Sequence, residues 1–142
     1  MARSKFNVDS NKDKRTYNGI VFDSVVEMKY YRDVVLPLED SGDIVSCELQ
    51  VPYELQPKFR HDNKTVRAIV YVADFVLTYK DGTSEVIDVK GCPDAVALLK
   101  RKMFWYHYPD VRYRWMTYAQ KFGGWIDYEE YKKLRKKEKF GG

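Results

Sequence analysis

The stretch that most constrains the fold is the longest apolar run of the chain, VRAIVYVADFVLTY at residues 66–79. A KDG sequence follows it, and a second apolar run, TSEVIDVKG at residues 83–91, returns. Both runs are rich in β-branched and aromatic residues, which is typical of central strands in a sheet that is covered on both faces. Asp74, Asp88 and Lys90 stand inside these strands, where sheet propensity favours Val or Ile.

The turn between the two strands decides whether these charges can meet. With a two-residue loop formed by DG, Asp74 opposes Val89, and Asp88 points to the opposite face of the sheet. With a three-residue loop formed by KDG, Asp74 lies opposite Asp88, and Lys90 follows on the same face. Gly82 then takes the left-handed conformation that such loops commonly need. The sequence permits both registers, and only the longer loop gives the charged residues a chemical role.

Two carboxylates that face each other across a pair of strands repel, and each loses hydration. A shared proton, a basic neighbour or a divalent cation resolves this repulsion. Oxygen ligands favour Mg²⁺ or Mn²⁺ over zinc, and a nearby lysine can orient a water molecule or offset charge that develops on a phosphate. Asp74, Asp88 and Lys90 therefore predict metal-dependent phosphodiester hydrolysis, with a structural Asp–Lys pair at the strand ends as the alternative.

A helix is predicted upstream of these strands, over residues 23–42. Ser24 is suited to cap it, and Glu27 stands three residues later, at the spacing of a capping box. Apolar residues recur through the segment at helical spacing. Pro37 predicts a kink or an end of the helix, and Gly42 marks its exit.

The remaining segments predict further strands and a second helix. Residues 43–56 alternate in polarity and predict a strand that is interrupted at Pro52, and residues 57–64 predict a polar, turn-rich connection. A second helix is expected over residues 93–108 and a last strand over residues 111–118. Together with the two central strands, the predicted order is helix, three strands, helix, strand.

The charge is unevenly distributed, although the net charge is only +4. Residues 1–16 carry five Lys or Arg and two acids, and residues 95–121 carry six Lys or Arg and one acid. Residues 127–140 carry six Lys or Arg and four acids. Residues 17–94 carry eight Lys or Arg and fourteen acids, so the centre of the sequence is acidic. Basic ends around an acidic centre suit a polyanion partner, with solvated lysine-rich faces as the alternative. The sequence lacks the apolar run of about 20 residues that a membrane helix needs and shows no signal peptide, so we expect a cytoplasmic protein.

The central strands resemble a known nuclease motif. The residues ADF, the spacing of fourteen positions from Asp74 to Asp88, and the residues DVKG resemble the PD-(D/E)XK nuclease superfamily. Ala73 stands where the name of the motif has Pro, and the second acid is Asp rather than the commoner Glu. The resemblance extends over about residues 20–120 and implies an α/β fold with a restriction-endonuclease-like core. In that core a mixed central sheet is flanked by helices in the order already predicted.

Within the superfamily, the chain is most similar to small phage and prophage endonucleases and Holliday-junction-resolvase-like proteins. On this basis we expect a flexible basic arm over residues 1–16 and a nuclease core over residues 17–126. A basic C-terminal helix or tail is expected over residues 127–142.

The resemblance also implies roles for individual residues. Asp74 and Asp88 would bind Mg²⁺, for which Mn²⁺ can substitute, and Lys90 would position the attacking water. The segment FDSVVEMKYYRDV resembles a first-helix motif in which a Glu reaches the metal site. This assigns Glu27 to the catalytic and metal-binding set, unless the capping box holds its side chain. The main-chain carbonyl of Val89 would complete the protein ligands.

Other residues are expected to lie near the site or to contact DNA. The segment ELQVPYEL resembles a stretch of the same group and places Gln50 near the acids. The candidates for DNA contacts are the basic side chains of the second helix, the last strand and the C-terminal helix: Lys100, Lys102, Arg112, Arg114, Lys133 and Lys136. Lys100 is also the candidate for a further polar residue beside the metal, with a solvated helix face as the alternative.

The function that these features imply is a Mg²⁺-dependent DNA endonuclease that acts on branched DNA in phage or prophage recombination or replication, inside a bacterial host. Resolution of a junction needs two opposed cuts, so we expect a homodimer. One alternative is a nuclease of the same core that acts on DNA ends, flaps or a specific sequence. The other is a non-catalytic DNA-binding protein that retains the fold, which the intact set of Asp74, Asp88 and Lys90 disfavours.

Overall fold

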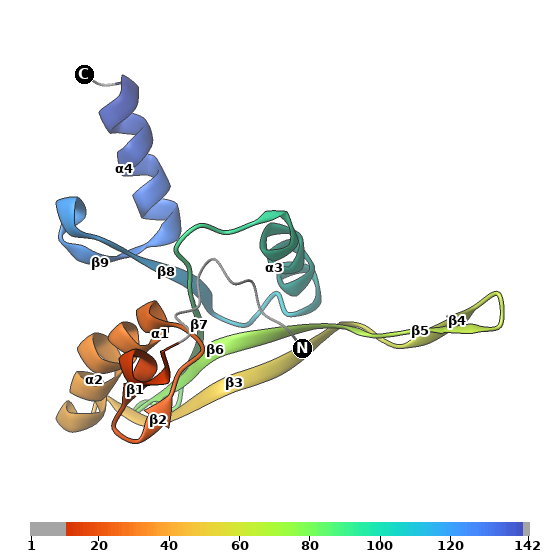
Figure 1. Cartoon of the computed structure of the whole chain (residues 1–142), viewed down its shortest axis with the longest axis horizontal. Helices are drawn as coiled ribbons and strands as arrows, with labels where there is room; N and C mark the ends of the chain where they lie inside the picture. The colour runs from red at the N-terminus through yellow and green to blue at the C-terminus, as the bar shows by residue number, and fades with distance from the viewer. Residues whose placement is uncertain (1–10, 141–142) are drawn as a thin grey trace.

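A central five-stranded sheet organises the molecule. The structure is a computed structural model that describes residues 11–140 (Figure 1). The strands follow the order β3-β6-β7-β8-β9 across the sheet. Their bounds are β3 (Ile44–Gln56), β6 (Ile69–Tyr79), β7 (Ser84–Val89), β8 (Tyr113–Ala119) and β9 (Gly124–Asp127). Strands β7 and β8 run parallel, and the other three neighbouring pairs are antiparallel. The predicted α/β fold with a mixed central sheet is therefore confirmed.

Helical segments precede, interrupt and follow the strands. They are α1 (Val25–Tyr30), η3 (Tyr31–Val35), α2 (Leu36–Ser41), α3 (Ala95–His107) and α4 (Tyr128–Phe140). The predicted succession of helix, three strands, helix and strand is present along the chain. Strand β9 was not predicted, and it carries the chain from β8 to α4, which leads away from the sheet (Figure 1).

The first helical stretch is shaped by its cap and its proline. The Ser24 hydroxyl accepts a hydrogen bond from the Glu27 amide at 3.2 Å, which confirms Ser24 as the N-cap. Pro37 has no N–H to donate, and its ring crowds the carbonyl four residues earlier. The segment η3 just before it is a π-helix, which accommodates that crowding without ending the helical path. Gly42 ends the stretch in the left-handed conformation, with φ of 82°.

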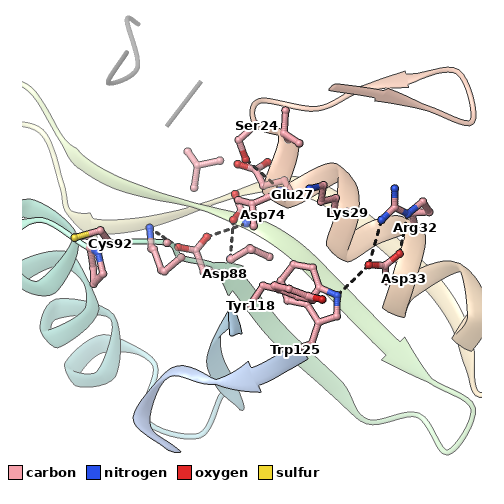
Figure 2. Close-up of a pocket in the computed structure, with 18 of the residues that line it drawn as sticks. Ser24, Glu27, Lys29, Arg32, Asp33, Asp74, Asp88, Cys92, Tyr118 and Trp125 are labelled. Carbon is pink, nitrogen blue, oxygen red and sulfur yellow. Dashed lines mark hydrogen bonds and ion pairs between the residues drawn. The ribbon is translucent and has the colours of Figure 1, made fainter. Parts of the chain in front are cut away.

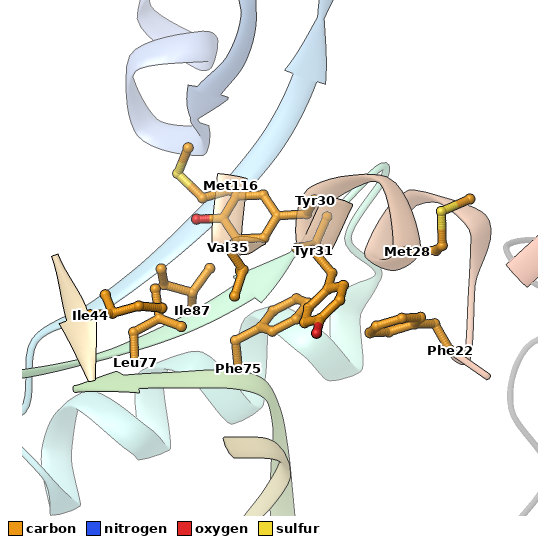
Figure 3. Close-up of a cluster of buried hydrophobic side chains, with 11 residues drawn as sticks. Phe22, Met28, Tyr30, Tyr31, Val35, Ile44, Phe75, Leu77, Ile87 and Met116 are labelled. Atoms are coloured by element: carbon orange, nitrogen blue, oxygen red, sulfur yellow. The ribbon is translucent and has the colours of Figure 1, made fainter. Parts of the chain in front are cut away.

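Apolar side chains are buried on both faces of the sheet. Ile87 belongs to one buried cluster and its neighbour Val86 to another, and successive side chains of a strand point to opposite faces. The first cluster packs the α1–η3 stretch onto the sheet (Figure 3) and consists of Phe22, Met28, Tyr30, Tyr31, Val35, Ile44, Phe75, Leu77, Ile87, Val89 and Met116. The second packs α3 onto the other face and consists of Leu55, Tyr71, Ala73, Val86 and Phe104. The helices are thus fixed to the sheet by burial of apolar area.

Two features of the β3 region differ from the prediction. Pro52 does not interrupt β3, because β3 is an edge strand and tolerates a residue without a donor; Pro52 pairs with Val72 of β6. Residues 57–64, predicted to be a polar, turn-rich connection, contribute to a hairpin of β4 (Phe59–His61) and β5 (Lys64–Val66). A turn is present in this segment, but the two short strands beside it were not predicted.

The N-terminal part of the described chain packs as small elements. These are η2 (Lys12–Arg15), β1 (Thr16–Tyr17) and β2 (Ile20–Val21), and a further short segment, η4 (Gln120–Phe122), lies between β8 and β9. Of the predicted basic arm over residues 1–16, residues 1–10 lie outside the described residues. Among the helices that the structure describes, none has the length and apolar character to cross a membrane.

Candidate active site

The turn between β6 and β7 has the three-residue form. The Tyr79 amide donates to the Thr83 carbonyl at 2.7 Å, and the Gly82 amide donates to the Tyr79 carbonyl at 2.9 Å. Gly82 has φ of 89°, as the longer loop requires. In this register Phe75 pairs with Ile87, so the next position in each strand is occupied by an aspartate. The register that places the two acids opposite each other is confirmed.

Asp74 and Asp88 take over the hydrogen bonds at the end of the β6–β7 ladder. The Asp74 amide donates to Asp88 Oδ1 at 3.3 Å, and the Val89 amide donates to Asp74 Oδ2 at 2.9 Å. Each carboxylate therefore accepts from the main chain of the other strand. The two residues are only 5% and 2% exposed. These hydrogen bonds fix both carboxylates in place, and burial leaves them short of water.

Glu27 and Gln50 join the two aspartates from neighbouring elements. Gln50 lies in β3 between Leu49 and Val51, whose partners in β6 flank Asp74. Its Nε2 lies 3.4 Å from Glu27 Oε2 and 3.5 Å from Asp74 Oδ1, so one amide contacts two carboxylates. Gln50 has φ of 53°, which is unusual for a residue other than glycine and is typical of constrained functional positions. Glu27 is 4% exposed, and its carboxylate faces the acids.

Lys90 supplies a positive charge at the edge of this cluster. Its Nζ lies 2.6 Å from Asp88 Oδ2, and its side chain is 25% exposed. The distance is that of an ion pair, although Asp88 Oδ2 makes no hydrogen bond of good geometry among the described residues. Lys90 Nζ also lies 5.3 Å from the centre of the Trp115 ring, which holds the ammonium on a second side. The lysine is thus positioned between Asp88 and solvent.

The acid cluster, defined as Glu27, Asp74 and Asp88, lines a cleft of ≈ 870 Å³ (Figure 2). The helical wall of the cleft comes from α1 and η3, and the opposite wall comes from the loop after β7. Lys29 and Arg32 also line it. A second hollow of ≈ 600 Å³ shares Lys90 with the cleft. The buried acids are therefore accessible from outside through this cleft.

Electrostatic repulsion is concentrated on Asp74. Burial raises the pKa of the Asp74 carboxyl well above its usual range, and the charges of Asp88 and Glu27 raise it further. The hydrogen bond from the Val89 amide lowers the pKa, but it is the smaller effect. Lys90 pairs with Asp88 at 2.6 Å, and a divalent cation bound beside Asp74 and Asp88 would reduce the repulsion between these two carboxylates.

The donor set fits a magnesium ion that keeps part of its water shell. Within residues 11–140, no group of three or more His, Cys, Asp or Glu side chains is arranged so that it could hold a metal ion. Magnesium usually binds through one or two carboxylates and several waters, so it requires no more carboxylates than the pair of Asp74 and Asp88. The carboxylate oxygens of Asp74 and Asp88 match that requirement, and Asp88 Oδ2 lies 2.6 Å from Lys90 Nζ.

The predicted DNA-contacting residues are dispersed. Lys100 lines the second hollow, and its Nζ donates to the Val70 carbonyl at 2.9 Å, so it lies near the cleft with its ammonium bonded to the main chain. Lys102 on α3 and Lys133 and Lys136 on α4 are exposed and do not line the cleft.

Arg112 and Arg114 do not join the acid cluster. In the β7–β8 register Asp88 pairs with Trp115, and the neighbouring Arg114 therefore points to the other face of the sheet. There Arg114 NH2 lies 3.1 Å from Glu85 Oε1, and Arg112 NH2 lies 3.7 Å from Glu85 Oε2. Glu85 is 5% exposed, so the two arginines compensate a buried charge. Their predicted role in DNA binding has no support from this placement.

Several residues of the cleft were not found by sequence reasoning. Lys29 and Arg32 are one helical turn apart on the stretch that carries Glu27, so they line the same cleft. Asp33 accepts from Trp125 Nε1 at 3.2 Å and thereby links η3 to β9. The basic pair has a sequence signal in its helical spacing, whereas Trp125 comes from a strand that was not predicted.

Comparison with known proteins gives a family but no activity. A search of curated proteins found no match. The family model described as "Protein of unknown function (DUF1064)" matches residues 3–124, which include the sheet up to the start of β9 and every residue of the acid cluster. Because the match extends over most of the sequence, the chain belongs to the DUF1064 family.

Proposed function

We propose that this protein is a Mg²⁺-dependent endodeoxyribonuclease of the PD-(D/E)XK type. The observation that carries the proposal is the convergence of Glu27, Asp74, Asp88 and Lys90 in one cleft, although they come from three separate elements. A purely structural Asp–Lys pair does not explain why two further buried carboxylates surround it. Buried like charges are expensive unless a cation or a proton compensates them.

The arrangement of elements supports the same proposal. The helix that carries Glu27, the three strands that carry Gln50, Asp74 and Asp88, then α3 and β8 follow one another in the order that the resemblance implies. Ala73 at the position of the motif's proline is fully buried in the second cluster. A small apolar side chain there is compatible with the packing of β6, so this departure from the motif has a local structural reason.

The roles of the residues follow from their contacts. Asp74 and Asp88 would hold the metal, with Glu27 and the Val89 carbonyl as further ligands. When bound, Mg²⁺ supplies positive charge to the scissile phosphate and lowers the pKa of a coordinated water. Lys90, next to Asp88 and partly exposed, orients the attacking water or stabilises negative charge on the phosphate oxygens. Water adds to phosphorus, the bond to the 3′ oxygen breaks, and the ends are a 5′-phosphate and a 3′-hydroxyl.

Branched DNA is the proposed substrate, with a Holliday junction as the specific form. This choice comes from the resemblance to junction-resolvase-like proteins, and a homodimer would place two such clefts for the two opposed cuts. Cleavage of ends, flaps or one specific sequence by the same cleft would require the same acid cluster, so the choice of substrate must be tested separately from the chemistry.

The test is cleavage of a four-way junction, a flap, a linear duplex and single strands, each with Mg²⁺, Mn²⁺ or EDTA. Asp88→Asn removes a metal-binding charge without changing the size of the side chain. We expect its cleavage rate to fall by at least about 100-fold, in the range found when one electrostatic contribution to catalysis is removed, while DNA binding persists. Symmetric cuts confined to the junction would support the full proposal.

Asp127→Asn is the matched control. Asp127 accepts a hydrogen bond from the Glu129 amide at 2.8 Å at the start of α4, and Asn caps helices equally well. Asp127 does not line the cleft. This variant removes one carboxylate without touching the acid cluster, so its cleavage rate should stay within about threefold of wild type, since the change in transition-state energy is then below about 1 kcal/mol. Wild-type binding without cleavage under both metals would instead identify a non-catalytic DNA-binding protein, and cleavage of linear duplex would favour a different DNA substrate.

A further inference from the structure

The hairpin at the far end of β3 and β6 is a second candidate site for a partner. We call residues 57–68 the arm; they include β4, β5 and the residues that connect these to β3 and β6. Gln56 pairs with Ile69 and Phe59 pairs with Val66, so the arm continues the β3–β6 register. It extends beyond the rest of the molecule as a narrow two-stranded ribbon (Figure 1).

The arm contributes no residue to either buried cluster. Residues 57–65 are all exposed, and even the large apolar side chain of Phe59 is 44% exposed. A two-stranded ribbon without a covered face is only marginally stable in water. The arm therefore gains little stability from packing, and its composition indicates which kind of partner it binds.

The arm is strongly basic. It contains four Lys or Arg against one acid, Asp62, which gives a net charge of +3, whereas the whole chain has +4. The basic residues are Lys58, Arg60, Lys64 and Arg67. They lie on a surface that is separate from the positions predicted on α3, β8 and α4. A basic ribbon with this charge density is complementary to a polyanion.

The tip of the arm is rigidly shaped. Asp62 and Asn63 have φ of 49° and 61°, the two positive values that a type I′ hairpin turn needs. Arg60 NH2 donates to the Asn63 carbonyl at 2.6 Å, and NH1 donates to Thr65 Oγ1 at 3.2 Å. These bonds span the two strands and hold the guanidinium in one place. The Arg60 side chain therefore loses less conformational entropy when a partner binds.

We propose that the arm lies in the major groove of duplex DNA and contacts its phosphates. The major groove of B-DNA admits a two-stranded ribbon, and basic side chains on its edges reach the phosphates on either side. The inference rests on the proposed function for the identity of the nucleic acid. It extends that function, because it assigns a second DNA contact far from the cleft.

The length of the arm sets where this contact falls. Asp62 is twelve residues from Asp74 along one continuous ribbon, and extended chain rises about 3.3 Å per residue, so the tip lies up to about 40 Å from the acid cluster. One turn of DNA measures about 34–36 Å along its axis. The arm therefore reaches roughly one helical turn from the proposed cleavage point. Duplex that extends at least that far should bind more tightly than shorter duplex.

The test uses fluorescence anisotropy with labelled 12-bp and 30-bp duplexes in EDTA, so that no cleavage occurs. One variant replaces Lys58, Arg60, Lys64 and Arg67 with Gln. A second replaces residues 57–68 by Asn-Gly, which closes a two-residue turn between the paired Gln56 and Ile69. The control variant replaces four exposed lysines elsewhere with Gln: Lys12, Lys80, Lys121 and Lys139. Thermal melting confirms that each variant is folded.

We expect wild type and the control to bind the 30-bp duplex more tightly than the 12-bp duplex. In both arm variants the ratio of the two affinities should be at least tenfold smaller than in wild type. The slope of log affinity against log salt should also become shallower by about 0.9 for each phosphate contact that is lost. Equal preference and equal slope in wild type and the arm variants would overturn the inference. A change of oligomeric state on shortening the arm, with DNA affinity unchanged, would also overturn it and would show that the arm joins copies of the chain.

These outcomes separate the arm from the proposed activity. If wild type binds long duplex through the arm yet never cleaves DNA with Mg²⁺, the activity is wrong and the arm inference stands. If wild type cleaves DNA and the arm variants bind and cleave equally well, the arm inference fails and the activity stands.

Discussion

At the scale of single residues, the acid cluster is held by side chains that each perform more than one task. Asp74 and Asp88 replace main-chain acceptors at the point where the β6–β7 ladder ends. Gln50 contacts two carboxylates with one amide group. Such a donor lowers the repulsion between the acids without adding charge. The orientation of the Glu27 and Asp74 carboxylates therefore depends in part on the amide of Gln50.

Two substitutions of Gln50 separate its side chain from its backbone conformation. Both Gln50→Ala and Gln50→Gly remove the amide that contacts Glu27 and Asp74. A φ of 53° strains alanine but not glycine, so the Gly variant should be more stable than the Ala variant by about 1 kcal/mol. Urea unfolding measures this difference. Equal stability of the two variants would contradict a strained backbone at this position.

Cleavage by the Gln50 variants tests the positioning role. We expect both to retain Mg²⁺-dependent cleavage at a rate lowered by about tenfold, since loss of a hydrogen bond to a charged group costs about 1.5 kcal/mol. Gln50→Glu is the informative comparison, because it keeps the shape and adds a fourth carboxylate. The added negative charge should shift its metal requirement to lower Mg²⁺ concentration and should weaken its fold in EDTA, and an unchanged metal titration would argue against contact between Gln50 and the acids.

At the scale of elements, a tight turn fixes the geometry of the site. The three-residue loop at Gly82 sets the register of β6 against β7, and a shift by one residue would send Asp88 to the opposite face. The helix that carries Glu27 begins at Ser24, whose cap determines where that carboxylate lies. The cleft thus depends on two local signals, a turn and a cap, each of which is independent of the acids themselves.

Gly82→Ala tests the contribution of the turn. Gly82 has φ of 89°, and an added Cβ would meet no atom within 4 Å, so the cost arises from backbone conformation rather than from a clash. We expect a loss of stability of about 1–2 kcal/mol in chemical denaturation. Gly82→Asn should lose less, because asparagine tolerates positive φ better than alanine does. A neutral Gly82→Ala would indicate that the loop takes another conformation in solution.

At the scale of the whole molecule, the cleft, the ion pairs of Glu85 and the arm lie in different regions of the sheet. The cleft opens beside α1 and the loop after β7, and the ion pairs of Glu85 lie on the face of the sheet opposite to Asp88. The arm of residues 57–68 extends from the β3–β6 end (Figure 1). The stable cores on both faces support a site whose charges oppose folding. Such a balance is typical of sites that are completed by a ligand.

The stability of the whole fold should depend on pH through Asp74. Its pKa is raised in the folded chain above the ordinary value of about 3.9, so folded protein retains the proton at pH values where unfolded protein has lost it. The stabilisation is therefore fully present below about pH 4 and decreases as the pH rises toward the folded pKa. The charges of Asp88 and Glu27 add to the effect of burial on this pKa, and Lys90 pairs with Asp88 at 2.6 Å.

Urea unfolding in EDTA from pH 4 to pH 8 tests this dependence against Asp74→Asn. We expect the variant to gain stability relative to wild type as the pH rises, and Mg²⁺ to reduce the difference at pH 7.5. A ligand at 100 times its Kd stabilises a fold by about 2.7 kcal/mol, which sets the scale of the Mg²⁺ effect. A difference between the two proteins that does not vary with pH would contradict the raised pKa of Asp74.

The sequence by itself determined the local features of this protein. The cap at Ser24, the exit at Gly42, the central hairpin and the order of the main elements are set by short-range preferences, and the acids were recognisable because charge is rare in buried strands. The sequence permitted two forms of the turn at residues 79–83, and the structure selected one of them. The contact of Gln50 with Glu27 and Asp74 and the separation of Arg114 from Asp88 were decided only by the tertiary structure. These two features depend on strand pairing and on the faces of a sheet, which join residues far apart in the sequence. The arm likewise became visible only when residues 57–68 were found to have no core to cover them.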